Sequence, residues 1–286
     1  LYKIYNKRRT KNLTVNGELF GLNFKSDWKR NYSDPLKSLH NINILNPTID
    51  IKNIFEFKGK KKFNGTSQIV YSQDELEYKY KFNNDKINIS SPNNNKTNFN
   101  INGEILLKPF YLEGELIIKN KKVETLIDSI LLNLISYKEN YLGNLNGKLQ
   151  IKFEELRNKL IKKGEIDLLF KEKKISLNRA QFYLDNIGKI KTNMSVIKEN
   201  EEIKFITNNH LFIENHIEFA KTFQIGSNKI KNIKSIFFDL IKNIGQSEFI
   251  ITNIQIENSK YNKKSDEIYI VKNIQNLRAH IRKVID

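Results

Sequence analysis

The sequence predicts a mainly β protein, built as a long, curved, largely antiparallel sheet with one apolar face. We expect this sheet to stay open as a groove and to carry about three amphipathic helices. Apolar and polar residues alternate with a period of two over many short segments, which indicates strands with one buried face. Turn residues, such as the Asn-Asn-Asp run at 83–85, separate these segments after short intervals.

Strand candidates follow one another through most of the chain. In residues 75–82, for example, Leu76, Tyr78, Tyr80 and Phe82 alternate with charged residues. Short connections between such segments favour an antiparallel meander over βαβ units. The candidate strands are residues 13–24, 47–57, 63–71, 75–82, 86–90, 97–107, 110–119, 143–153, 164–171, 174–184, 188–197, 202–207, 211–225 and 247–257.

Six glycines recur near the start of these strands, and each lies in the apolar phase of its strand. Because glycine has no side chain, it makes room on a buried face where a sheet bends or where another group packs closely. We therefore expect these residues to bend the sheet. They are Gly17, Gly65, Gly103, Gly114, Gly147 and Gly164.

Three segments have the apolar spacing of amphipathic helices, at residues 122–138, 228–244 and 265–285. Gly245 is a suitable stop for the second helix, and Ser265 begins the third. Such helices either cover the apolar face of the sheet or contact lipid or a partner. The first helix also suggests a division into an N-terminal sheet segment, 1–121, and a C-terminal segment, 122–286.

The composition limits the classes of function. The net charge is +17, yet lysine outnumbers arginine 42 to 7, whereas phosphate-binding proteins favour arginine. The charge therefore reflects either the codon bias of an AT-rich genome and a solvated face, or an anionic partner. The absence of cysteine excludes disulfides, thiolate metal sites and cysteine nucleophiles. No segment has the run of about 18 apolar residues that a transmembrane helix needs.

No catalytic pattern is present in the sequence. The four histidines have neither the i, i+4 nor the i, i+2 spacing of a metal site. A Gly-x-Ser-x-Gly elbow, a dinucleotide-binding glycine set and a carboxylate cluster are also missing. We therefore expect a protein that is not an enzyme, with no cofactor, no metal site and no specific nucleic-acid partner.

The strand openings, in which glycine and a polar residue precede alternating apolar residues, resemble those of the AsmA-like family of bacterial envelope proteins. The resemblance covers residues 97–286 and depends on the order of its motifs more than on any one of them. The motifs are NGKLQIKF at 146–153, KGEIDL at 163–168, ISLNRAQF at 175–182, IGKI at 187–190 and VKNIQNLR at 271–278.

This resemblance implies a periplasmic protein, anchored to the inner membrane by a segment upstream of Leu1. Its apolar β-groove would hold or conduct phospholipid between the inner and outer membranes, with membranes and envelope proteins as partners. The candidate groove residues share the apolar strand phase, and ordinary core packing beneath a helix is the alternative for each. They are Leu116, Ile118, Leu149, Ile151, Phe153, Ile166, Leu168 and Phe170.

Two other classes of function stay open at this point. One is a periplasmic scaffold that assists outer-membrane protein assembly through its edge strands. The other is a basic nucleic-acid binder, whose binding would depend steeply on salt.

Overall fold

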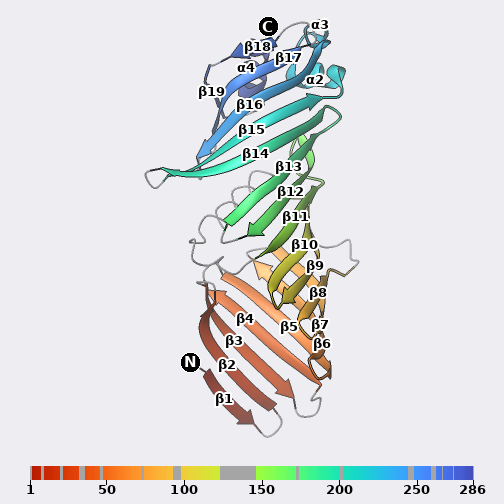
Figure 1. Ribbon diagram of the computed structural model, residues 1–286, viewed down its shortest axis with the longest axis vertical. Helices are drawn as coiled ribbons and strands as arrows, with labels where there is room; N and C mark the ends of the chain where they lie inside the picture. Colours follow the sequence, from red (N-terminus) through yellow and green to blue (C-terminus); the bar gives the residue numbers. More distant parts are fainter. Residues whose placement is uncertain are drawn as a thin grey trace. The chain divides into compact units, whose positions relative to one another are not determined.

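The computed structural model of the chain describes residues 2–7, 10–19, 22–31, 36–45, 48–71, 74–92, 98–122, 146–171, 174–199, 202–243, 248–258, 262–265, 267–272 and 274–285. These residues form one open, largely antiparallel sheet of 19 strands and three helices (Figure 1). The predicted mainly β, antiparallel class with about three helices is therefore confirmed.

The chain divides into two compact units. The described residues of the first are those up to Lys119, together with 146–152, 168–171 and 174–176. The second holds 120–122, 153–167 and the described residues from Leu177 onward. The predicted boundary near residue 121 stays a prediction.

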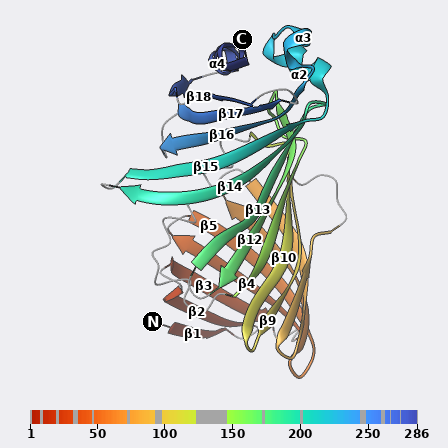
Figure 2. The same ribbon diagram turned by 45° about the horizontal axis from the view of Figure 1, so that its top comes forward.

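The first unit is built from hairpins, and each strand from β1 to β10 pairs with the next along the chain, as the short connections predicted. Within this unit the strand direction changes progressively from β1 to β10 (Figure 2). The strands are β1 (Tyr2–Lys7), β2 (Thr10–Leu19), β3 (Leu22–Asn31), β4 (Lys37–Leu45), β5 (Thr48–Gly59), β6 (Lys62–Tyr71), β7 (Asp74–Asn83), β8 (Lys86–Ser90), β9 (Phe99–Leu107) and β10 (Phe110–Lys119).

Three strands, β11 (Gly147–Glu154), β12 (Ile161–Lys171) and β13 (Lys174–Leu184), have residues in both units. The second unit continues with β14 (Gly188–Glu199), β15 (Glu202–Ile213), α2 (His216–Phe223), α3 (Ser227–Ile230), β16 (Ile233–Asn243), β17 (Phe249–Asn258), β18 (Asn262–Ser265), β19 (Tyr269–Val271) and α4 (Ile274–Ile285).

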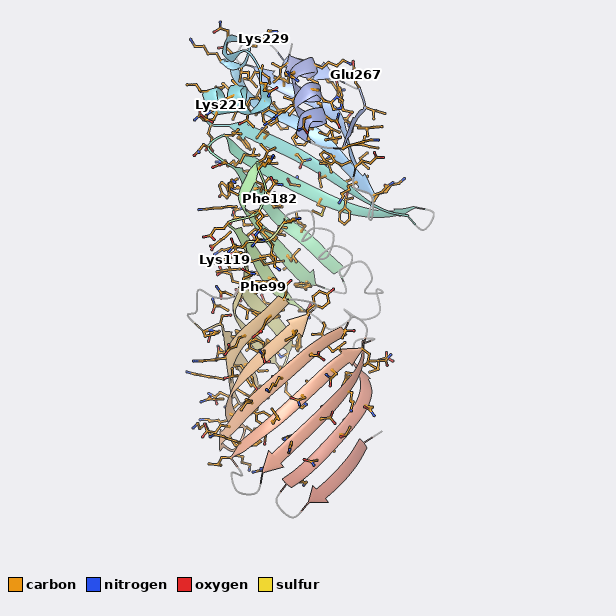
Figure 3. All side chains as sticks on the ribbon, turned by 180° about the vertical axis from the view of Figure 1, so that it is seen from behind. Phe99, Lys119, Phe182, Lys221, Lys229 and Glu267 are labelled. Atoms are coloured by element: carbon orange, nitrogen blue, oxygen red, sulfur yellow. The ribbon has the colours of Figure 1, made fainter. Side chains whose placement is uncertain are left out.

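The main buried core lies in the second unit. The helices gather beside the last strands (Figure 1) and pack their apolar side chains against one face of the sheet. Phe219 of α2 and Ile230 of α3 are fully buried there, next to Ile233 at the start of β16. Lys221 and Lys229 of the same helices are exposed (Figure 3). The amphipathic helices of this unit therefore cover the sheet.

The predicted helix at 228–244 is wrong. Only Ser227–Ile230 is helical, and Ile233–Asn243 is the strand β16, paired on both sides with β15 and β17. Two register shifts, between Ile233 and Ser235 and between Phe237 and Asp239, interrupt the pairing with β17. Such irregularities disturb the period-two pattern, and the remaining apolar spacing fits a helix. The isoleucine- and phenylalanine-rich composition of the segment is typical of strands.

The helix predicted at 265–285 begins nine residues later in the structure than the sequence suggested. Ser265 ends β18, and Tyr269–Val271 is a short strand that pairs with Phe249–Ile251 of β17 before α4 begins at Ile274. The aromatic and β-branched residues of β19 are typical of a strand, and they pair with the edge of β17 that β16 does not occupy. The predicted strand at 211–225 is also too long, because β15 ends at Ile213 and α2 follows. The predicted helix at 122–138 lies almost wholly outside the described residues.

Candidate functional site

The apolar face of the first unit is continuous across its strands. Residues directly opposite each other in an antiparallel pair lie on the same face of the sheet. One cross-strand row on this face runs from β4 to β10, and a second runs from β5 to β10. The first is Ser38, Phe55, Gly65, Tyr80, Ile89, Gly103 and Gly114, and the second is Phe57, Phe63, Phe82, Ile87, Ile105 and Leu112.

Aromatic rings gather on this face over β3 to β7. The ring centroids of Trp28 and Phe55 are 5.6 Å apart, and those of Phe55 and Phe63 are 5.7 Å apart. Phe63 stacks on Phe82 at 4.5 Å and meets the edge of Tyr80 at 6.1 Å. We call this set the aromatic patch: Trp28, Phe55, Phe57, Phe63, Tyr78, Tyr80 and Phe82.

The aromatic patch is only half-buried. Trp28 keeps 36% of its surface exposed, and the other six members fall between the buried and exposed classes. Each helix that the structure describes lies in the second unit, and so does the main core cluster. The described part of the chain therefore places no helix of the first unit over the patch.

Positive charge adjoins one end of the patch. The turn between β5 and β6 and the first residue of β6 carry three consecutive exposed lysines, Lys60, Lys61 and Lys62, next to the paired Phe57 and Phe63. The guanidinium carbon of Arg30 lies 5.4 Å from the ring centre of Phe57. The arrangement therefore combines an apolar aromatic surface with a cationic end.

Two ionisable side chains on this face are partly removed from water. Burial and, as a smaller effect, the neighbouring Tyr78 raise the pKa of the Tyr80 hydroxyl to about 12. Burial also lowers the pKa of His40, whose Nε2 lies 2.6 Å from the Ser26 hydroxyl. Both shifts favour the neutral form, so Tyr80 and His40 are uncharged at neutral pH.

The glycines make room for protein atoms of neighbouring strands. A Cβ at Gly65 would lie 2.3 Å from the Tyr80 ring, and one at Gly164 would lie 2.5 Å from the ring of Phe182 (Figure 3). Gly17 faces the ring of Phe24 in the same way, at 3.2 Å. Aromatic cover over a cross-strand glycine is a known way to stabilise such positions.

The other three glycines allow backbones to approach closely. Gly103 and Gly114 oppose each other in β9 and β10, and a Cβ on Gly103 would lie 2.6 Å from the carbonyl oxygen of Glu113. Gly147 has a φ of +156°, and a Cβ there would lie 2.0 Å from the carbonyl oxygen of Leu112. The predicted role of all six in bending the sheet stays a prediction.

The eight predicted groove residues lie on β10, β11 and β12 and are less accessible than the aromatic patch. Ile118, Ile151, Phe153, Ile166, Leu168 and Phe170 are each at most 8% exposed, whereas Leu116 and Leu149 are half-buried. Little of the first six side chains is thus available to a ligand, and their role in a groove stays a prediction.

Sequence reasoning left the aromatic patch out of the predicted site. The sequence nevertheless contains a signal for an aromatic face. Tyr78, Tyr80 and Phe82 alternate with charged residues, and Phe55, Phe57 and Phe63 flank an earlier turn. Which of the many apolar faces lacks a helical cover depends on where the helices pack.

The described residues contain no group of three or more acidic or histidine side chains that could hold a metal ion. Nor is any helix in the described ranges both long enough and apolar enough to cross a membrane. The chain matches no family model, no curated protein and no solved structure.

Proposed function

We propose that this chain is a non-enzymatic protein of the bacterial envelope that holds or conducts phospholipid between membranes. The acyl chains would lie on the aromatic patch. The observation that carries the proposal is a contiguous aromatic face, half-exposed and without a helix from its own unit over it in the described residues. Exposed apolar surfaces of this kind mark interaction or ligand-binding sites.

The energetics favour an acyl chain as the ligand. Burying a methylene group contributes about 0.8 kcal/mol, and a long acyl chain has many of them to offset the entropy cost of binding. Rings that already pack against one another, such as Phe63 and Phe82, need little reordering when a chain covers them.

The charge distribution supports a phospholipid with an anionic headgroup. Lys60, Lys61 and Lys62 are exposed to solvent at the β5–β6 end of the aromatic patch, where a headgroup could remain hydrated. Their attraction to phosphate is that of exposed charges, so it adds modestly to the affinity and weakens with salt.

Trp28 offers a direct test, because it is the only tryptophan in the chain and belongs to the patch. The purified chain is incubated with vesicles of phosphatidylglycerol whose acyl chains carry bromine, and is then separated from the vesicles. Bromine quenches tryptophan only at short range. We expect the fluorescence of Trp28 to fall and native mass spectrometry to show bound lipid.

Adjacent residues of β5 provide the matched variants. Phe55 belongs to the patch, whereas its neighbour Ile54 is 51% exposed and lies in the opposite strand phase. We expect Phe55→Glu to abolish quenching and lipid capture, and Ile54→Glu to leave both unchanged, with circular dichroism confirming that each variant is folded. Equal loss in the two variants, or no lipid on the unaltered chain, would contradict the proposal. Capture of a strand-forming peptide without lipid would favour the scaffold.

A further inference from the structure

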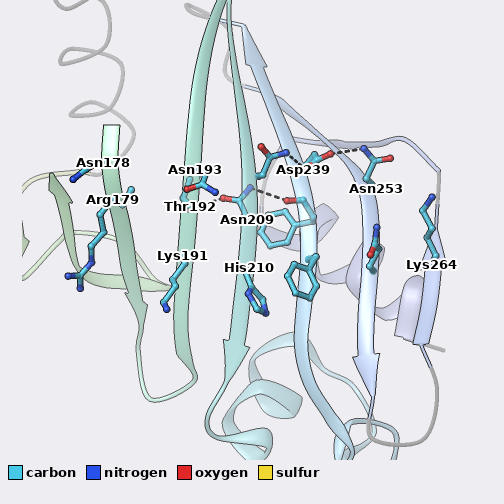
Figure 4. A pocket seen from close by; sticks show the side chains of 15 residues that line it. Asn178, Arg179, Lys191, Thr192, Asn193, Asn209, His210, Asp239, Asn253 and Lys264 are labelled. Atoms are coloured by element: carbon cyan, nitrogen blue, oxygen red, sulfur yellow. Dashed lines mark hydrogen bonds between the residues drawn. The ribbon is translucent and has the colours of Figure 1, made fainter. Parts of the chain in front are cut away.

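A second candidate site lies on the polar face of β14 to β18, within the second unit. It is a cavity of about 820 Å³ (Figure 4), which falls in the usual range for ligand sites. Lys191, Asn193, Asn208 and Phe237 line it and are exposed, so the cavity opens to solvent. The aromatic patch belongs to the first unit, and nothing in the following argument depends on lipid binding.

Strand register arranges the lining residues of this cavity in two rows. Lys191, His210, Phe237, Gln255 and Lys264 oppose one another on five consecutive strands, and we call them the cation row. Asn193, Asn208 and Asp239 form the acceptor row, and each lies two residues from a member of the cation row on β14, β15 or β16. Residues two apart in a strand share a face, so both rows face the cavity, about 7 Å apart.

The cation row presents positive charge at both ends and ring edges between them. His210 stacks on Phe237 with centroids 3.7 Å apart and lies 3.8 Å from Phe212, so these rings cover one another's faces. Phe237 is nevertheless 38% exposed. The edge of an aromatic ring carries partial positive charge, as do lysine and the amide hydrogens of glutamine. The row is therefore suited to acidic groups.

The acceptor row has the opposite character. The Asn208 amide donates to Asp239 Oδ1 at 2.7 Å, and the Asn253 amide donates to Asp239 Oδ2 at 2.6 Å (Figure 4). The carboxylate is thus fixed, and the amide oxygens of both asparagines are held in defined orientations as acceptors. A ligand that binds along this row therefore needs hydrogen-bond donors, such as hydroxyl groups.

The strands that form the floor of the cavity are braced on the opposite face of the sheet, where Thr192, Thr207 and Asn209 alternate with the residues of the two rows. Thr192 donates to Asn209 Oδ1 at 2.9 Å, and the Asn209 amide donates to the Thr207 hydroxyl at 2.8 Å and to the carbonyl oxygen of Phe238 at 3.3 Å. These side chains are largely buried and join β14, β15 and β16. A floor fixed in this way keeps the two rows in place before a ligand arrives.

We propose that this cavity binds an acidic saccharide, with its acidic groups at the cation row and its hydroxyl groups at the acceptor row. Adjacent strands are about 4.8 Å apart, which is roughly the advance of one hexose along an oligosaccharide, so successive sugars could follow successive strands. Single-stranded DNA fits less well, because base stacking needs open ring faces and its sugar-phosphate backbone offers no hydroxyl donor to the acceptor row.

The test uses isothermal titration of the full chain at about 0.15 M salt, where non-specific attraction to a basic protein is screened. Trigalacturonic acid is the acidic probe, maltotriose the neutral one, and an oligothymidylate represents nucleic acid. We expect trigalacturonic acid to bind most tightly. Lys191→Gln should weaken it by up to about fivefold, as for the loss of an ion pair at an exposed lysine.

Lys81→Gln is the matched control, since Lys81 is an exposed lysine of β7 in the first unit. It should leave binding unchanged, whereas Asn208→Ala should weaken binding through the acceptor row. Absence of trigalacturonate binding, equal binding of maltotriose, tighter binding of the oligothymidylate, or an equal effect of Lys81→Gln and Lys191→Gln would each overturn the proposal.

Discussion

The contact between Gly103 and β10 leads to a quantitative prediction about the first unit. A Cβ added at Gly103 would lie 2.6 Å from the carbonyl oxygen of Glu113 and 2.9 Å from the Cα of Gly114. Both obstacles are backbone atoms, so no side-chain rotation relieves the clash. In Gly103→Ala the two strands would have to separate locally and weaken their hydrogen bonds.

The size of the effect follows from these contacts. Overpacking costs about 1–3 kcal/mol, and each weakened backbone hydrogen bond adds about 1 kcal/mol. We therefore expect Gly103→Ala to lower the free energy of unfolding of the first unit by about 2–4 kcal/mol. Gly17→Ala is the control, because its Cβ would meet only the tip of the Phe24 ring, at 3.2 Å, and that ring can move. Its cost should stay below about 1 kcal/mol.

Urea unfolding followed by Trp28 fluorescence measures both variants, because Trp28 reports on the first unit. The midpoint of Gly103→Ala should fall well below that of the unaltered chain, and that of Gly17→Ala should fall slightly. If the two variants lose the same stability, the close approach of β9 and β10 does not limit this position, and the reasoning is refuted.

Three further predictions concern packing, capping and pH. Phe219→Ala removes a fully buried ring that packs on Phe223 at 4.6 Å, so it should cost the second unit about 3–5 kcal/mol by circular dichroism while the Trp28 transition stays unchanged. Asn215→Ala removes the side chain that caps α2 through two backbone amides, which should cost about 1 kcal/mol, and an unchanged stability would contradict that role. Burial holds the pKa of His40 below its ordinary 6.5, so as pH falls below about 6.5 the unfolded chain takes up the proton first and the first unit loses stability. His40→Gln should flatten this dependence when the Trp28 transition is followed from pH 7 downward, and an unchanged slope would disprove it.

Strands with regular alternation could be predicted closely from the sequence. The expected strand at 75–82 is β7, Asp74–Asn83, and the one at 110–119 is β10, Phe110–Lys119. Each has one face toward apolar neighbours and one toward water, so the period of two appears in the residues themselves. The strand β4, Lys37–Leu45, was missed, although Leu39, Asn41 and Asn43 alternate there with His40, Ile42 and Ile44. Asparagine and histidine make that contrast weak.

The C-terminal region was predicted least well. The segment Ile233–Asn243 shows a helical spacing because register shifts interrupt its pairing with β17. One of its strand partners, β15, ends 20 residues before β16 begins, so no local pattern reveals that pairing. Long-range pairing overrides a local helical preference when both edges of a strand find partners.

The candidate site depends on which apolar face has a cover. Sequence alternation marks Ile151 and Leu168 as apolar in the same way as Phe55 and Phe63. In the folded chain the first two are 3% and 6% exposed, whereas the latter two are half-buried. No property of the individual strands distinguishes these pairs, because burial is set by the elements that pack on them.

The sequence by itself determined the strand-rich class, the antiparallel hairpins and the polarity of each strand, because these follow from alternation and turn residues a few positions apart. The tertiary structure alone decided that the described helices and the main core lie in the second unit, that the aromatic rings of β3 to β7 join into one patch, and that Lys191 and Asn208 reach the same cavity. These features arise from strand register and packing between residues far apart in the chain, and such contacts leave no mark in the local order of the amino acids.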